Sequence, residues 1–292
     1  MDIFRYLHFF KQSQFGFNLP KCSIVNYLKF HYGLIDDKIG ECGKIYPVLC
    51  TIEVTKRCNL QCPFCIFGKF PSNWQENELT PSKFEKILNL DLIKKTLIFV
   101  FSGGEPLLNK DLPKLVYMAR KRKHLVGMIS NGILLNEEIA KSLAKVGGKD
   151  SIAGISDIQI SIYENTKDKL SYILPKVSQY MPINPSFVLL KSKLLESSKN
   201  NFVDLIDMII MAKESGCKSF KFNICAADII KNDFSETISK QDDIIYSQFI
   251  EACKTKLKGI VFKGYKSDYS FLSKKFSLFF PKWHDESDGR KC

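Results

Sequence analysis

From about residue 46 onwards, short β-branched or aromatic runs alternate with longer segments whose apolar residues recur at helical spacing. This alternation is typical of a parallel α/β fold, in which each strand is followed by a loop and a helix. The pattern predicts six strands, at Val48–Val54, Thr96–Ser102, Leu125–Ser130, Asp157–Tyr163, Pro185–Lys191 and Ser219–Cys225.

Several of these strands have one apolar and one polar face. In Asp157–Tyr163, three isoleucines alternate with Gln159, Ser161 and Tyr163, and in Ser219–Cys225 the polar row includes Asn223. Flat parallel sheets are buried on both faces and give continuous apolar runs, so alternation favours a barrel with a polar interior. A half-exposed sheet is the alternative. We expect a partial (β/α)6 TIM-like barrel.

Local signals predict where several helices begin and end. Thr80 precedes Pro81 at one helix start, and Asn109 and Asn136 are candidate N-caps for the next two helices. Gly147 and Gly216 are candidate C-terminal glycines. Pro175 is expected to kink or shorten the fourth helix, and a fifth is expected from about Phe202 to Ser215.

The domain organisation follows from where this rhythm starts and stops. Residues 1–45 form an N-terminal extension, residues 46–226 the barrel and residues 227–292 a short C-terminal appendage. The appendage is expected to contain a helix near Asp243–Lys256, a strand at Gly259–Tyr265 and an aromatic tail.

Composition narrows the class of protein. The chain has 292 residues, 10 cysteines and a formal net charge of +12. No apolar run is long enough for a membrane span, and the N-terminus lacks a secretory signal, so we expect a cytoplasmic protein with reduced cysteines. The excess lysines are spread along the chain, and only Ala119–Lys123 concentrates them. This spread favours a solvated surface over a nucleic-acid stripe.

Three cysteines gather directly after the first predicted strand, where Cys58, Cys62 and Cys65 form a CxxxCxxC spacing. A zinc site usually pairs two CxxC knuckles, and the sequence has no second one. A redox dithiol would leave Cys58 without a role. An iron–sulfur cluster would use all three thiolates and leave one iron open to a ligand.

With the aromatic Phe64 before its last cysteine, this motif resembles that of the radical S-adenosylmethionine (radical SAM) superfamily. The segment Gly103, Gly104, Glu105 and Pro106 at the end of the second strand resembles the superfamily's GGEP segment. The resemblance implies a 4Fe–4S cluster on the three cysteines and S-adenosylmethionine on its open iron. It also implies that the GGEP segment holds the methionine amino group.

Further positions agree with the same resemblance. Ser130 and Asn131 follow the third strand as the superfamily's SNG or TNG segment does, and are expected to meet the ribose or the methionine carboxylate. Ser161 is expected near the ribose, Phe64 on the adenine, and the backbone near Asn223 at the adenine edge. All these positions lie at strand ends that meet at one mouth of the barrel.

The resemblance implies that a 5′-deoxyadenosyl radical abstracts hydrogen from a peptide or small-molecule substrate. A flavodoxin or ferredoxin is the implied reductant, and the basic surface suits such an acidic partner. The alternatives are radical modification of RNA, a non-catalytic iron–sulfur electron carrier and a zinc-binding module. We disfavour nucleic acid as a partner and expect no membrane.

Within the superfamily, the sequence looks most like the branch with SPASM or twitch auxiliary-cluster domains. Those domains need several more cysteines, whereas here Gly289–Cys292 resembles only the start of one. The expectation is an incomplete auxiliary domain, lost or truncated, with Cys292 a terminal thiol rather than a ligand.

Overall fold

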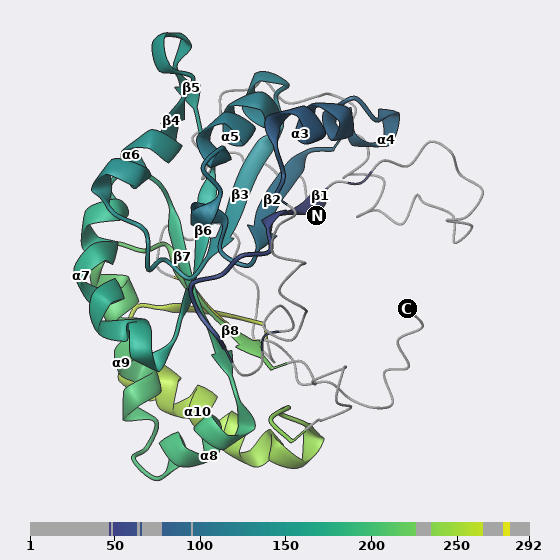
Figure 1. Ribbon diagram of the computed structural model, residues 1–292. Helices are drawn as coiled ribbons and strands as arrows, with labels where there is room; N and C mark the ends of the chain where they lie inside the picture. Colours follow the sequence, from purple (N-terminus) through teal and green to yellow (C-terminus); the bar gives the residue numbers. More distant parts are fainter. Residues whose placement is uncertain are drawn as a thin grey trace, which may run out of the picture. The chain divides into compact units, whose positions relative to one another are not determined.

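The computed structural model describes residues 47, 49–62, 65, 78–94, 96–225, 235–264 and 277–280 (Figure 1). The predicted extension at residues 1–45 and the segment Gly289–Cys292 lie outside this part of the chain. Two compact units divide the chain, Met1–Gln61 with Lys69–Gln159 and Cys62–Gly68 with Ile160–Cys292. Each unit is described by itself.

The first unit is built on strands of one sheet. They are β1 (Leu49–Thr55), β2 (Ile98–Gly103), β3 (Leu125–Ser130) and the first half of β6 (Asp157–Ile162), in the order β1-β2-β3-β6. The pairs β1–β2 and β2–β3 are parallel. Leu49 pairs with Ile98, and Ile98 with Leu125, so β1, β2 and β3 run in step. Their carboxyl ends therefore reach the same edge.

Amphipathic helices cover this sheet. The helices are α3 (Pro81–Leu88), α4 (Asp91–Lys94), α5 (Leu112–Lys121) and α6 (Glu137–Ala144), with short 3-10 helices η3 (Pro106–Leu108) and η4 (Gly148–Asp150). Phe84 of α3 is fully buried and meets the rings of Phe99 and Phe101 of β2 edge-on, with centroids 5.7 and 5.6 Å away. An antiparallel pair, β4 (Lys145–Val146) and β5 (Ile152–Ala153), follows α6.

The second unit repeats the same plan. Its strands are the rest of β6, β7 (Ile183–Leu189), β8 (Ser219–Ile224), β10 (Ser277–Phe280) and β9 (Val261–Gly264), in the order β6-β7-β8-β10-β9. The pairs β7–β8, β8–β10 and β10–β9 are parallel. Its helices are α7 (Lys167–Val177), α8 (Lys191–Ser198), α9 (Val203–Glu214) and α10 (Asp243–Lys256), with 3-10 helices η5 (Glu164–Thr166) and η6 (Lys240–Asp242).

The predicted fold class is confirmed. All six predicted strands are present, each within two residues of its predicted ends, and β1 and β9 are edge strands of their units. The alternation in β6 is also confirmed, because Ile158, Ile160 and Ile162 are fully buried while the residues between them are half-exposed. The strand β10 and the helices α4 and α8 were not predicted.

Three local predictions are confirmed. Thr80 caps α3 by accepting a hydrogen bond from the backbone of Lys83, and Asn136 caps α6 through the backbone N–H of Ile139. Gly216 follows the end of α9 at a positive φ of 76°.

One other local prediction is wrong in detail. Gly147 follows the two-residue strand β4 rather than closing α6, because the chain leaves the helix at Lys145 to form the β4–β5 pair. Pro175 lies inside α7, which ends two residues later at Val177. This position agrees with the prediction that the proline shortens the helix.

Candidate active site at the carboxyl ends of the strands

The cysteine loop leaves β1 at Thr55. Cys58 is exposed, Cys62 and Cys65 are half-buried, and none of the three forms a disulfide with another described cysteine. The backbone N–H of Cys65 donates to the carbonyl of Cys62 at 3.0 Å, which gives that part of the loop a tight turn. Cys58 belongs to the first unit, and the other two cysteines to the second.

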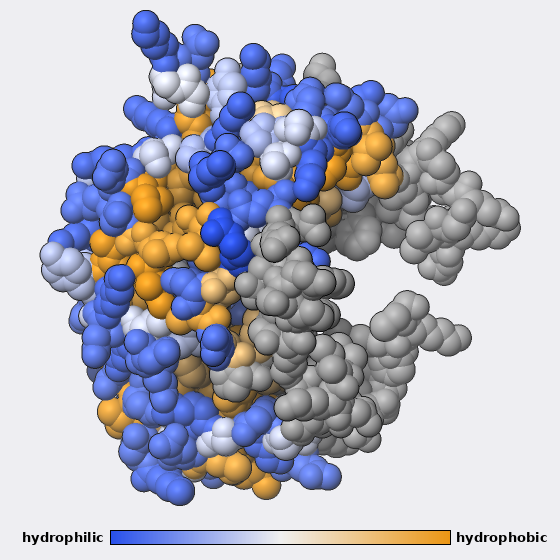
Figure 2. Space-filling model, viewed as in Figure 1, coloured by the Kyte–Doolittle hydropathy of each residue, from blue (hydrophilic) through white to orange (hydrophobic). Residues whose placement is uncertain are grey.

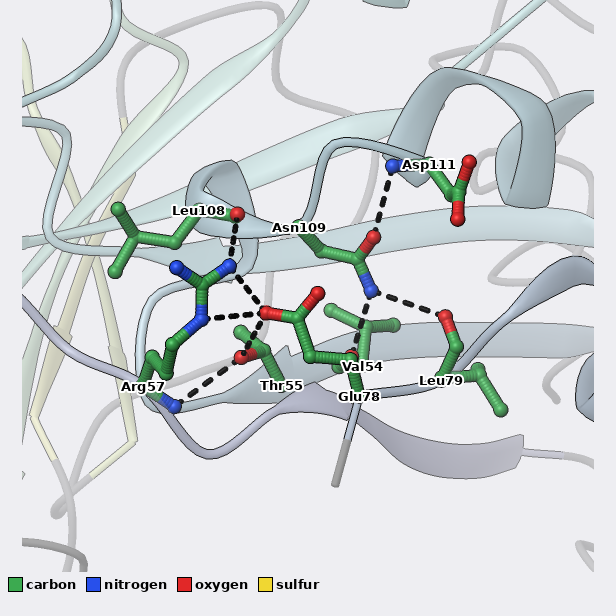
Figure 3. A network of polar contacts seen from close by, with 8 residues as sticks. All are labelled: Val54, Thr55, Arg57, Glu78, Leu79, Leu108, Asn109 and Asp111. Carbon is green, nitrogen blue, oxygen red and sulfur yellow. Dashed lines mark hydrogen bonds and ion pairs between the residues drawn. The ribbon is translucent and has the colours of Figure 1, made fainter. Parts of the chain in front are cut away.

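Arg57 fastens the start of this loop to the first unit (Figure 3). Its backbone N–H donates to the Thr55 hydroxyl at 3.1 Å, and its guanidinium donates to the carboxylate of Glu78 and, at 2.7 Å, to the carbonyl of Leu108. The Thr55 hydroxyl also donates to Glu78, at 3.1 Å. The residue directly before Cys58 is thus held by three segments of the chain.

Asn109 ties the same region together from inside (Figure 3). Its side-chain amide donates to the carbonyls of Val54, at 2.7 Å, and Leu79, at 3.1 Å, and its oxygen accepts from the backbone of Asp111. The predicted N-cap role for Asn109 is wrong, because α5 begins at Leu112 and its N-cap position is Asp111. The side-chain amide of Asn109 is instead hydrogen bonded to the buried carbonyls of Val54 and Leu79.

The two glycines of the GGEP segment let it lie against the cysteine loop. The N–H of Gly104 donates to the carbonyl of Thr55 at 2.9 Å, and that of Glu105 to the carbonyl of Arg57 at 2.8 Å. A Cβ on Gly103, which has φ +130°, would lie 2.1 Å from the Thr55 oxygen, and one on Gly104 would lie 2.1 Å from the Arg57 oxygen. A side chain at either position would collide with these carbonyl oxygens. Only glycine therefore lets the GGEP segment lie this close to the start of the cysteine loop.

Glu105 joins the GGEP segment to the segment after β3. Its carboxylate is fully buried and accepts from the Ser130 hydroxyl at 2.8 Å, the Asn131 backbone at 2.8 Å and the Leu107 backbone at 3.1 Å. Burial raises the pKa of Glu105, and the three donors act in the opposite direction. Pro106, also buried, starts the short helix η3.

Asn131 carries the network onward to a cysteine. Its side-chain amide donates to the Oδ1 of Asn59 at 2.8 Å and to the Sγ of Cys58 at 3.9 Å. Its own Oδ1 accepts from the backbone of Ile133 at 3.0 Å. The backbone N–H of Leu60 also donates to the Cys58 sulfur, at 3.4 Å. Two N–H groups, from the Asn131 side chain and the Leu60 backbone, therefore donate to the sulfur of Cys58.

The structure thus brings together most of the site residues predicted in the first unit. The GGEP segment, the Ser130–Asn131 segment and Cys58 form one hydrogen-bonded network. Sequence reasoning missed Arg57 and Glu78. The position of Arg57 next to a cysteine was a usable signal, whereas nothing in the local pattern marked Glu78.

In the second unit, Ser161 and Asn223 are half-exposed on the polar faces of β6 and β8, as predicted. Tyr163 lies beside Ser161 and Cys62. Burial raises the pKa of Tyr163, Cys62 raises it further, and the Ser161 hydroxyl acts against the shift. Phe64 lies outside the described residues.

The donor set suits an iron–sulfur cluster. Such clusters are held by cysteine thiolates and tuned by hydrogen bonds to their sulfurs, and this loop offers three cysteines outside disulfides, one of which accepts from two N–H donors. In the part of the chain that the structure describes, no three Cys, His, Asp or Glu side chains are already gathered around a metal position. The fit rests on the chemistry of the thiols and their donors.

A family model described as the Radical SAM superfamily matches residues 52–238. This range contains the cysteine loop, the GGEP segment and the Ser130–Asn131 segment, so the chain belongs to the radical SAM superfamily. Members of this superfamily bind a 4Fe–4S cluster and S-adenosylmethionine.

Among the relatives is a PqqA peptide cyclase of Granulibacter bethesdensis, 35% identical over 112 residues, 38% of this chain and 28% of that protein. An Fe-coproporphyrin III synthase of Methanosarcina barkeri is 35% identical over 95 residues, 32% of this chain and 24% of that protein. The crystal structure of Streptococcus suis SuiB bound to S-adenosylmethionine is similar in fold, with a TM-score of 0.58 and 13% identity, and covers 81% of this chain and 51% of SuiB.

The chain spans about half or less of the length of these relatives. Their names support the resemblance to the branch with SPASM or twitch domains.

Among the described helices, none has the length and apolar character needed to cross a bilayer. On the face drawn in Figure 2, hydrophilic residues are spread widely rather than gathered in one stripe.

Proposed function

We propose that this chain is the radical-generating part of a radical SAM enzyme, in which Cys58, Cys62 and Cys65 hold a 4Fe–4S cluster. One observation carries the proposal. Both other motif segments are hydrogen bonded to the segment that bears Cys58, the GGEP segment through Thr55 and Arg57 and the other through Asn131.

When bound, the cluster and S-adenosylmethionine supply the reaction. With one electron from an external reductant, they would supply cleavage of the carbon–sulfur bond of the sulfonium, to methionine and a 5′-deoxyadenosyl radical, and abstraction of a hydrogen atom from the substrate. The chain's own residues hold the reacting groups in place. A flavodoxin or ferredoxin remains our prediction for the electron donor.

Within this proposal, the GGEP segment binds the methionine ammonium chiefly through backbone carbonyls. A carboxylate offers about four acceptor positions, and three at Glu105 are already taken by protein donors. Glu105 therefore acts as a positioning residue that links the GGEP segment to the Ser130–Asn131 segment. Ser161 and Asn223 are assigned to the adenosyl part, because both are half-exposed on the polar faces of their strands.

A peptide is the substrate class that we propose. The PqqA peptide cyclases of two organisms are relatives by sequence, and SuiB, similar in fold, was solved bound to its precursor peptide SuiA. A small molecule is the second candidate, because a pterin dimethyltransferase of Methanocaldococcus jannaschii is 29% identical over 181 residues.

The test is anaerobic. The protein is reconstituted with iron and sulfide, reduced with dithionite and mixed with S-adenosylmethionine, and 5′-deoxyadenosine is measured. We expect product from the wild type and none from Cys58→Ala, Cys62→Ala or Cys65→Ala. The matched control is Cys50→Ala, because Cys50 lies half-buried on β1 outside the loop and should leave product formation unchanged. Bound zinc without iron, or iron without cleavage, would refute the proposal.

The substrate class is tested by isotope transfer. An extract of the native host grown on deuterated medium is separated into a peptide fraction and a small-molecule fraction, and each is added to the reduced enzyme. Deuterium in 5′-deoxyadenosine from the peptide fraction alone is expected, whereas transfer only from small molecules would overturn the assignment to a peptide.

A further inference from the structure

We propose that Asn131 is a positioning residue whose side-chain amide donates a hydrogen bond to the cluster ligand Cys58 and thereby raises the cluster's reduction potential. The inference rests on the proposed function, which supplies the cluster. The amide nitrogen of Asn131 lies 3.9 Å from the Sγ of Cys58 and donates a hydrogen bond to it.

The orientation of this amide is fixed from several sides. The Asn131 oxygen accepts from the backbone of Ile133 at 3.0 Å, which distinguishes the oxygen end of the side chain from the nitrogen end. The nitrogen also donates to Asn59 at 2.8 Å, and the Asn131 backbone N–H donates to the buried carboxylate of Glu105 at 2.8 Å. Because Asn131 is only 6% exposed, water competes little for its amide.

Glu105 has a share in this arrangement. Its two oxygens hold the Ser130 hydroxyl and the Asn131 backbone, so the carboxylate sets where the residue after β3 lies. The Ser130 hydroxyl in turn accepts from the backbone of Gly132 at 2.9 Å, which closes a tight turn around Asn131. Glu105 therefore connects the end of β2 to Asn131, whose side-chain amide donates to Cys58.

The effect on a cluster has a definite sign. A reduced cluster carries one more negative charge than an oxidised one, and that charge is shared by the ligand sulfurs. An N–H donor stabilises the more negative state and so raises the reduction potential. The backbone N–H of Leu60, 3.4 Å from the same sulfur, acts in the same direction but cannot be removed by changing a side chain. The Asn131 donor can be removed by a side-chain substitution.

The test compares Asn131→Leu with the wild type as reconstituted full-length protein. Leucine is close to asparagine in size but has no donor. The reduced cluster is counted by electron paramagnetic resonance while the solution potential is stepped, and bound iron is measured separately. At a fixed potential we expect the ratio of reduced to oxidised cluster to fall about two- to tenfold, the range for one modest hydrogen bond. Tenfold corresponds to about 59 mV for one electron.

A second pair of variants guards against a general disturbance of the fold. Asn131→Asp keeps the oxygen that accepts from Ile133 but loses the donor, and Asn136→Asp makes the same change at a residue that caps α6 through its oxygen. Asn131→Asp also adds a negative charge beside the cluster, which lowers the potential in the same direction. The potential should therefore fall further in Asn131→Asp than in Asn131→Leu and stay at the wild-type value in Asn136→Asp.

The outcomes separate the inference from the function on which it rests. If the wild type takes up no four-iron cluster, the proposed function fails and the inference falls with it. If the wild type binds the cluster and cleaves S-adenosylmethionine but Asn131→Leu keeps the same potential, the inference alone is overturned. A loss of iron with an unchanged potential in the remaining cluster would make Asn131 merely structural and would overturn it as well.

Discussion

The two ends of the strands in the first unit are both buried and polar, but they are built differently. At the carboxyl ends, the hydrogen bonds run from Glu105 through Asn131 to the thiol of Cys58. At the amino ends, the ring Nδ1 of His124 lies 2.7 Å from the carbonyl of Thr96. One network ends at a cysteine thiol and the other at a backbone carbonyl.

The amino ends form a closed arrangement. His124 is 1% exposed, meets the ring of Phe99 edge-on and has its carbonyl bonded to the guanidinium of Arg120 at 2.9 Å. Arg120 also donates to the carbonyl of Ala153 at 2.8 Å. Each of these three hydrogen bonds satisfies a main-chain carbonyl.

This contrast indicates which buried polar residues serve the candidate site. In barrels of parallel strands, the active site lies at the carboxyl ends, and the opposite face serves stability. Burial alone does not separate Glu105 from His124. What separates them is whether the chain of hydrogen bonds continues to a group that can take part in chemistry.

Gly104→Ala should sharpen this contrast most. The new Cβ would meet the Arg57 carbonyl oxygen at 2.1 Å, and neighbouring hydrogen bonds prevent that carbonyl from moving away cheaply. We expect a loss of about 3 kcal/mol in the free energy of unfolding, measured by urea denaturation, together with loss of iron binding.

The control for this substitution is Gly148→Ala. Gly148 has a φ of +59° but no atom within 4 Å of an added Cβ. Only the backbone conformation is then penalised, by about 1 kcal/mol, and iron binding should be kept. Equal losses of stability and iron in both variants would show that the close approach at Gly104 is unimportant.

Glu105→Gln should have the next largest effect. Glutamine offers one acceptor oxygen where the carboxylate offers two, so one of the three donors loses its partner inside the protein. We expect a loss of about 2 kcal/mol in stability by chemical denaturation. An unchanged stability would mean that Glu105 does not bind these donors as a carboxylate.

His124→Gln should change stability least and alter its pH dependence. Burial holds the pKa of His124 below its ordinary value, with Arg122 and Arg120 acting in the same direction and Thr96 against. The unfolded chain therefore takes up the proton first, and the free energy of unfolding falls as the pH drops below about 6.5. Glutamine retains a donor for Thr96 but does not titrate, so this part of the pH dependence should disappear from denaturation curves recorded between pH 7 and 5. A full pH dependence in the variant would assign the effect to other groups.

The sequence predicted the strands and the motif segments well, because both are local patterns. Alternation along Asp157–Tyr163 predicted β6, and the spacing of three cysteines and a GGEP segment predicted the candidate site. Asn109 was misread as a helix cap because its partner Val54 is 55 residues away. Glu78 escaped notice for the same reason, since its partner Arg57 is 21 residues away. Long-range polar contacts leave no periodic signal in a single sequence.

We propose that the carboxyl ends of these strands build the site for S-adenosylmethionine. The most direct test measures the binding of labelled S-adenosylmethionine by equilibrium dialysis to the reconstituted wild type, Glu105→Gln and His124→Gln, since the last two place the same residue at opposite ends. The account predicts at least tenfold weaker binding for Glu105→Gln and wild-type affinity for His124→Gln. Equal affinities in both variants, or a greater loss in His124→Gln, would contradict it.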